Sequence, residues 1–104
     1  MKIVELREYQ IKPGKTEQWL NWMRDELLPY QRSKGMRILN TSHYQDDNGV
    51  DFFVWMREFD SEEDRQAVYK ETYNDWWTND VRPKVFELIE ESAISVKLMK
   101  PLSF

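Results

Sequence analysis

The sequence predicts an α+β fold with the element order βαββααβ, built as a ferredoxin-like, four-stranded antiparallel sheet that carries its helices on one face. Two patterns predict this fold class. Apolar and polar residues alternate in four segments, and apolar residues recur at helical spacing in three segments between them. The 104 residues contain no repeat, low-complexity stretch or linker, so we expect one domain over residues 1–104.

The first two elements are a strand and a helix. Residues 3–11 alternate until Lys12-Pro13-Gly14 stops the strand. Apolar side chains then recur at helical spacing over residues 16–33, with Thr16 as a credible N-cap. Pro29 removes one backbone donor, so we expect the last turn of this helix to kink or tighten.

A β-hairpin follows. Residues 36–45 and 50–59 are both β-like, and the residues between them favour a tight turn. A two-residue turn at Asn48-Gly49, or one residue earlier, leads to the same assignment of faces. One face then carries Leu39, Thr41, His43, Phe52, Val54 and Met56. The other carries Ile38, Asn40, Ser42, Tyr44, Phe53, Trp55, Arg57 and Phe59.

Two helices and a last strand complete the predicted order. Residues 60–64 offer two capping arrangements, Asp60 with Glu63 or Ser61 with Asp64. Asp80 is the expected cap of the next helix, with Pro83 in its first turn, and Trp76-Trp77 falls in the loop before it. Residues 93–99 alternate and form the last strand.

Composition excludes several classes of protein. Without cysteine there is no disulfide framework, thiolate metal site or cysteine nucleophile. A net charge of −4 without a basic cluster argues against nucleic acid as a partner. No stretch approaches membrane-spanning length, and the charged first ten residues do not look like a secretory signal. We therefore expect no membrane partner and a cytoplasmic location.

Both faces of the predicted hairpin carry large apolar side chains, which indicates that both faces are covered. The helices cover one face. Leaving the other in water would forgo the burial of several aromatic and aliphatic side chains, each worth roughly 1.5–3 kcal/mol. We expect a second copy of the chain to cover it, so that two sheets pack face to face in a homodimer.

Four segments resemble the NIPSNAP family of the dimeric α+β barrel superfamily, and the likeness spans nearly the whole chain. They are Glu5-Leu6-Arg7-Glu8-Tyr9, Lys12-Pro13-Gly14-Lys15, the stretch from Phe53 to Ser61, and Arg82-Pro83. The resemblance implies a homodimer with a cavity between sheet and helices in each subunit. Relatives in the superfamily include cofactor-independent monooxygenases, haem-degrading enzymes and isomerases. The NIPSNAP branch itself has no agreed catalytic set, so no catalytic residues are implied.

His43 and Tyr9 are the candidate catalytic residues. His43 is the only side chain with an unperturbed pKa near neutrality, and a base with an oriented phenol suits cofactor-free chemistry on a substrate that forms its own carbanion. A half-buried, hydrogen-bonded histidine is the structural alternative. No second histidine exists, so we expect no metal site and no cofactor.

The candidate ligand-binding residues are aromatic or basic, and they are Arg7, Tyr44, Trp55, Arg57, Trp19 and Trp22. Arg7 lies two residues from both Glu5 and Tyr9 on one face of the first strand, and Trp55 and Arg57 share a face of the third. Trp19 and Trp22 cannot both lie at the centre of the helix stripe, so one of them is a candidate for a cavity wall. Core packing, and pairing of Arg7 with Glu5 or Glu58, are the alternatives.

Two functions stay open from the sequence, and a haem-degrading enzyme, in which His43 would face an open, apolar cleft, is a third option. The first is a homodimeric protein that binds a small apolar or aromatic molecule in a cavity between sheet and helices, with a cofactor-free monooxygenase or isomerase as the possible activities. The second is a non-catalytic binding or protein-interaction module. A pocket of a few hundred Å³ reached by two or more polar side chains would favour the first.

Overall fold

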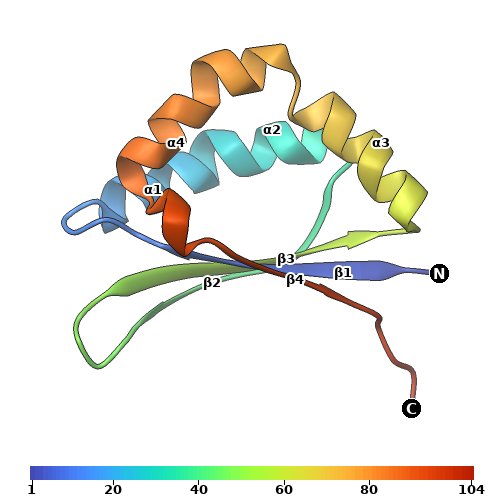
Figure 1. Ribbon diagram of the computed structural model, residues 1–104, viewed down its shortest axis with the longest axis horizontal. Coiled ribbons are helices and arrows are strands. Elements are labelled where there is room, and N and C mark those ends of the chain that lie inside the picture. Colours follow the sequence, from blue (N-terminus) through green and yellow to red (C-terminus); the bar gives the residue numbers. More distant parts are fainter.

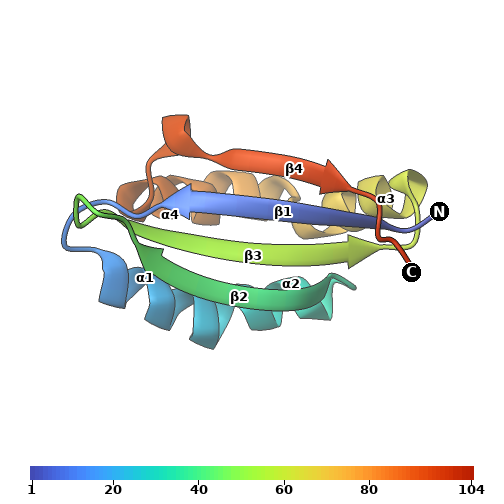
Figure 2. The ribbon, with the colours of Figure 1, turned by 90° about the horizontal axis from the view of Figure 1, so that it is seen from below.

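The computed structural model describes residues 1–104 and has one antiparallel sheet with the strand order β2-β3-β1-β4. The strands are β1 (Ile3–Gln10), β2 (Arg37–Gln45), β3 (Asp51–Phe59) and β4 (Ser95–Met99). All helices lie on one side of the sheet, and the other side is bare (Figures 1 and 2). The predicted fold class is confirmed. None of the helices is both long enough and apolar enough to cross a lipid bilayer.

The helical layer contains two π-helical turns. Its segments are α1 (Thr16–Trp22), η1 (Met23–Leu27), α2 (Leu28–Ser33), α3 (Glu62–Thr72), η2 (Trp77–Val81), α4 (Arg82–Leu88) and the short η3 (Glu91–Ala93). The π turns are η1 and η2, and each directly precedes an α-helix whose second residue is a proline, Pro29 or Pro83.

We expected Pro29 to kink or tighten the last turn of its helix. The structure shows no tighter turn there; a wider turn, η1, precedes Pro29. A proline in a helix has no N–H, and its ring clashes with the carbonyl four residues earlier. For Pro29 and Pro83 these carbonyls belong to Asp25 and Asn79, which lie inside η1 and η2. The longer hydrogen-bonded ring of a π turn accommodates the clash without ending the helix.

The predicted cap of α3 is confirmed, whereas the cap of α1 is not. The Ser61 hydroxyl accepts a hydrogen bond from the Asp64 N–H at 3.0 Å, and the Asp64 carboxylate accepts one from the Asp60 N–H at 2.9 Å. Thr16 does not cap α1; its hydroxyl instead donates to the Asp51 carboxylate at 2.7 Å, which ties the start of α1 to β3.

The last helical stretch begins before the expected cap at Asp80. The Asn74 side-chain oxygen accepts a hydrogen bond from the Trp77 N–H at 3.0 Å. Asn caps helices as well as Asp does, so the earlier residue starts the helix. Trp76 and Trp77 consequently lie in helical structure, and the expectation that they form a loop is wrong.

The hairpin register differs from the predicted one. The Asp46 N–H donates to the Val50 carbonyl at 2.9 Å, which leaves a three-residue loop that ends at Gly49 with a φ of +80°. His43 therefore pairs with Phe53, not with Val54 or Phe52. Because side chains alternate along a strand, one extra loop residue moves residues 40–45 of β2 to the other face relative to β3. A bulge between Ile38 and Asn40 then restores the predicted pairing, so Ile38 lies opposite Arg57. The predicted grouping of His43 with Phe52, Val54 and Met56 is wrong, and so is that of Tyr44 with Trp55 and Arg57.

The two faces of the sheet have different surroundings. The face toward the helices carries Glu5, Arg7 and Tyr9 of β1 and Phe53, Trp55, Arg57 and Phe59 of β3. The buried apolar residues of this face and of the helices form one core. The bare face carries the alternate residues Leu6, Glu8, Phe52, Val54 and Met56, together with Tyr44, whose ring stacks on Phe52.

Candidate functional site

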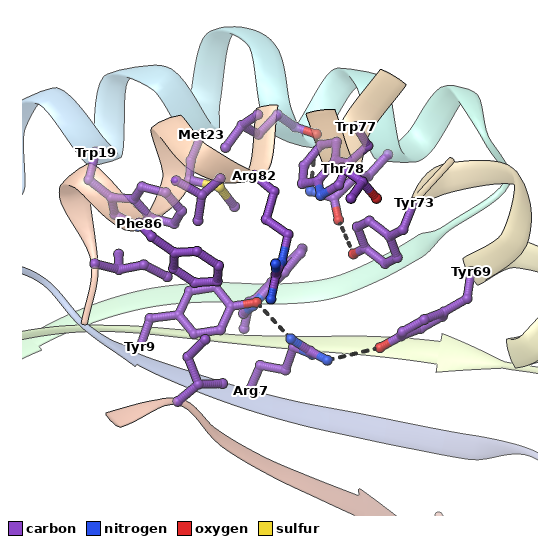
Figure 3. Close-up of a pocket in the computed structure, with 16 residues that line it drawn as sticks. Arg7, Tyr9, Trp19, Met23, Tyr69, Tyr73, Trp77, Thr78, Arg82 and Phe86 are labelled. Carbon is purple, nitrogen blue, oxygen red and sulfur yellow. Dashed lines mark hydrogen bonds between the residues drawn. The ribbon is translucent and has the colours of Figure 1, made fainter. Parts of the chain in front are cut away.

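A cavity of about 250 Å³ lies between the helix-covered face of the sheet and the helices (Figure 3). Twelve of its 16 lining residues are hydrophobic, and no aspartate or glutamate is among them. The polar or charged lining side chains are Arg7, Gln31, Tyr9, Tyr69, Tyr73, Thr78 and Arg82. The cavity is thus an apolar chamber whose polar groups are mostly hydrogen-bond donors.

Both π turns contribute to the wall of the cavity. Met23 and Leu27 come from η1, and Trp77 and Thr78 come from η2. Arg82, the first residue after η2, also lines it. π turns are rare and are frequent at functional sites, where they change the direction of side chains relative to the helix. Here two separate π turns face the same chamber.

A cluster of aromatic rings forms the wall opposite α4. Tyr9 contacts the rings of Trp19 and Trp55 edge to face, with centroids 6.0 and 6.1 Å apart. Trp19 also packs edge to face against Phe53, at 6.0 Å. The buried indole N–H groups of Trp19 and Trp55 have no hydrogen-bond acceptor. A wall of interlocked aromatic rings holds its shape and presents apolar area at little entropic cost.

Below this wall lies a buried ion pair between Arg57 of β3 and Glu5 of β1, both 0% exposed. Glu5 also accepts hydrogen bonds from Arg7 Nε and from Arg65 Nε, each at 2.9 Å. Arg57 donates to the hydroxyls of Tyr69 and Tyr73, and its guanidinium lies 4.6 Å from the Trp55 ring. The network joins two strands to α3 through side chains.

The charge state of this network follows from its contacts. Burial on its own would raise the pKa of Glu5, but the guanidinium of Arg57, the hydroxyl of Tyr69 and the guanidinium of Arg7 lower it to about 2. Burial raises the pKa of Tyr69 and of Tyr73, so both phenols stay protonated. The carboxylate of Glu5 is therefore a single negative charge that contacts three guanidinium groups, those of Arg7, Arg57 and Arg65.

Arg7 connects this network to the cavity. It uses Nε for Glu5, Nη1 for the Tyr9 hydroxyl at 3.1 Å and Nη2 for the Tyr69 hydroxyl at 3.2 Å. A guanidinium has five N–H groups, so two remain unused. The Tyr9 hydroxyl accepts from Arg7, and no protein group accepts its own proton.

The structure places the sequence-predicted site residues in different environments. Arg7, Tyr9, Trp19 and Trp55 line the cavity, and Arg57 lies beside it in the buried ion pair. Trp22 lines a separate groove with Trp76, and Tyr44 lies on the bare face of the sheet. Of Trp19 and Trp22, only Trp19 is a wall of the cavity.

His43 does not line the cavity. Its Nε2 lies 2.8 Å from the Asp51 carboxylate, and its side chain is 39% exposed. It borders a shallow surface groove with Leu20 and Arg24. The structure therefore does not bring His43 and Tyr9 into one site. No three residues of the types that bind metal ions come together either.

Several cavity residues had no functional signal in the sequence. Tyr69 lies on α3 and Tyr73 caps its C-terminal end, and their four-residue spacing is equally typical of the apolar side of a helix. Their hydroxyls meet Arg57 and Arg7 only because α3 crosses β3 and β1. Gln31 and Arg82 come from two other helices. Only the packing of the helical layer reveals these four residues.

The sheet order and the cavity define an α+β fold of ferredoxin-like topology with an aromatic chamber under its helices. The sequence profile of the NIPSNAP family matches residues 4–104. The chain therefore belongs to the NIPSNAP family, as its sequence resemblance predicts.

Solved structures of this family share the fold over its full length. A NIPSNAP family protein from Agrobacterium tumefaciens has a TM-score of 0.81 and 23% identity, covering 100% of this chain and 96% of that chain. Another from the same organism, described as having unknown function, has a TM-score of 0.79 and 25% identity, covering 99% and 90%. A NIPSNAP-like domain protein from Burkholderia xenovorans has a TM-score of 0.79 and 23% identity, covering 99% and 87%. No curated protein matches the sequence.

Proposed function

We propose that this NIPSNAP protein binds a small apolar or aromatic molecule in the cavity between sheet and helices. The observation that carries the proposal is the aromatic-walled chamber of about 250 Å³, which Arg7, Tyr9 and Arg82 reach with polar groups. Ligand pockets combine an apolar lining with a few placed polar groups, and typical volumes are about 300–1,000 Å³. A chamber just below that range suits a compact aromatic molecule with one or two rings.

The lining favours binding over proton abstraction. A cofactor-free monooxygenase or isomerase would need a base near its substrate. Neither histidine nor carboxylate lines the cavity, and burial raises the pKa of Tyr69 and Tyr73. The groups that face the chamber can therefore donate hydrogen bonds to a ligand, and we propose a binding role without a chemical step.

Heteronuclear NMR with the neutral, two-ring probe 2-naphthamide tests the binding site. The indole N–H signals of Trp19 and Trp55 are expected to shift, because these residues line the cavity alone. The signals of Trp22 and Trp76 are expected to stay, because these residues line a separate groove. Shifts of Trp22 and Trp76 without shifts of Trp19 and Trp55 would place the probe in that groove and refute the proposal.

The substitution Val85→Phe is expected to weaken binding of 2-naphthamide at least about tenfold, or 1.4 kcal/mol. Val85 is buried in α4 and lines the cavity, so a larger side chain there takes up the volume that the probe needs. Calorimetric titration measures the change. Val96→Phe is the matched control, because Val96 is 42% exposed on β4 and lies outside the cavity. Equal affinity for both variants would place the probe elsewhere.

We further propose that the protein is a homodimer that joins two bare sheet faces. Leu6, Phe52, Val54 and Met56 line this face, which no helix covers (Figure 2). The same face carries a negative charge, Glu8 on β1, and a positive charge, Lys97 on β4. Two copies that meet at this face therefore do not bring together surfaces of one charge sign. An isologous contact around a two-fold axis would bury this apolar strip on both copies.

Val54→Lys is expected to convert the dimer into a species with the 12.8 kDa mass of one chain. Val54 lies on β3, in the middle of the bare face, and a dimer would desolvate the introduced ammonium without a partner. Light scattering coupled to gel filtration measures the mass. Val96→Lys places the same change outside that face and is expected to leave the dimer intact. A wild-type mass of one chain would refute this part of the proposal.

A further inference from the structure

We propose that the ligand of the cavity is a small apolar carboxylate, whose anionic group lies between Arg7, Tyr9 and Arg82. This inference deepens the proposed function and rests on it, because it assigns a chemical class to the molecule in the same chamber.

The buried network around Glu5 carries more positive than negative charge. Three guanidinium groups contact the single carboxylate of Glu5, and only Arg65 has a second carboxylate, that of Glu62 at 2.9 Å. Arg7 and Arg57 therefore share one buried negative charge between them, which leaves one positive charge in excess. Burying an unpaired charge is costly, and the neighbouring phenols cannot offset it while they stay protonated. An anion in the adjacent chamber would balance this excess.

Unused hydrogen-bond donors of Arg7 and Tyr9 define where the anion would bind. Two N–H groups of Arg7 and the hydroxyl proton of Tyr9 have no acceptor in the protein, and both side chains line the cavity. A carboxylate offers about four lone-pair sites and accepts from a guanidinium and a phenol at once. The chamber contains no carboxylate of its own that could occupy these donors.

Arg82 brings a second guanidinium toward the same point. Figure 3 shows its side chain extending from α4 toward Tyr9 and Arg7. It lies 5.0 Å from the Phe86 ring, and it pairs with Glu91 at 3.1 Å in a contact that is more than half exposed on both sides. Exposed pairs of this kind are worth little, so Arg82 can exchange Glu91 for a ligand. A ligand carboxylate in the chamber would then meet two guanidiniums, those of Arg7 and Arg82.

The apolar part of the ligand then packs against the aromatic wall of the cavity. Trp19, Trp55, Met23 and Phe86 surround the remaining volume. The site therefore discriminates by the charge of the head group and by the flat, apolar shape of the body. The site selects against cations, because the guanidiniums of Arg7 and Arg82 repel them.

The test compares two isosteric pairs of probes, benzoate with benzamide and 2-naphthoate with 2-naphthamide, titrated calorimetrically at pH 7. We expect the better-fitting carboxylate to bind at least about tenfold more tightly than its amide, as a hydrogen bond to a charged group is worth about 1.5–3 kcal/mol. Tyr9→Phe and Arg82→Gln are each expected to reduce this ratio, and the combined variant to reduce it further, while Arg7 keeps part of the selectivity. Neither change touches Glu5, so the buried ion pair that supports the fold stays in place.

Arg24→Gln and Tyr44→Phe are the matched controls, and both are expected to keep the wild-type ratio. Arg24 pairs with Asp25 on the surface, as Arg82 pairs with Glu91, and Tyr44 lies on the bare face of the sheet. If the amides bind in the cavity as tightly as the carboxylates, the charge selectivity is refuted and the binding proposal stands. If neither probe of either pair shifts the signals of the cavity tryptophans, the binding proposal fails and this inference fails with it.

Discussion

Replacing Glu5 by Gln is expected to lower the free energy of unfolding by about 3 kcal/mol at pH 7. The change leaves the size of the side chain intact but removes the only negative charge in contact with Arg7 and Arg57. Breaking a buried pair by removing one partner typically costs about 3–5 kcal/mol, because the other charge stays buried. For a domain of about 100 residues, 3 kcal/mol corresponds to a fall in Tm of about 12–24 °C.

Urea denaturation and calorimetry of Glu5→Gln and Glu62→Gln measure this effect. Glu62 makes the same kind of contact with Arg65, but its side chain is 47% exposed. Exposed ion pairs contribute about 0–1 kcal/mol, so Glu62→Gln is expected to stay close to the wild type. If both variants lose equal stability, the buried network is not a main support of the fold.

The stability advantage of the wild type over Glu5→Gln is expected to disappear in acid. The pKa of Glu5 is about 2 in the folded chain, against its usual 4.5. A carboxyl with a lowered folded-state pKa stabilises the fold fully above pH 4.5, and this contribution is lost as the pH falls toward 2. At about 1.4 kcal/mol for each pH unit between the two values, the contribution is about 3 kcal/mol.

Because Gln resembles a protonated glutamate in shape, the variant isolates the charge of Glu5 from all other carboxylates. Urea titrations of both proteins at several values between pH 7 and pH 2.5 give the difference in unfolding free energy directly. The difference is expected to be constant above pH 5 and to shrink below pH 4.5. A difference that does not change with pH would mean that folding leaves the pKa of Glu5 unshifted, contrary to its contacts with three guanidinium groups.

Part of the site could be predicted from strand periodicity alone. Residues two apart on a strand share a face, so Glu5, Arg7 and Tyr9 were expected together, and they do lie together on the helix side of β1. The same rule applies to Trp55 and Arg57 on β3. The rule does not predict pairing across the hairpin, because that depends on the number of loop residues. The observed loop has three residues and not two, so His43 shares a face with Phe53 and not with Phe52 or Val54.

The helical side of the site could not be predicted in this way. Tyr69, Tyr73 and Arg82 lie on segments whose amphipathic patterns show that one side is buried, but not which strand residue each meets. Both π turns were also unforeseen, although Pro29 and Pro83 mark where the helices are disturbed. A proline shows that a helix must adapt, while the packing around it selects the form of the adaptation.

By itself, the sequence determined the element order, the family and the faces of the individual strands, because these depend on local periodicity and on short motifs. Only the tertiary structure decided that Arg7, Tyr9 and Arg82 converge on one aromatic chamber and that His43 lies outside it. The physical reason is that convergence depends on the parity of a hairpin loop and on the docking of three helical segments onto the sheet. The docking is set by contacts between residues far apart in the chain. The loop length is set by the geometry of the turn at residues 46–50, which strand periodicity does not record.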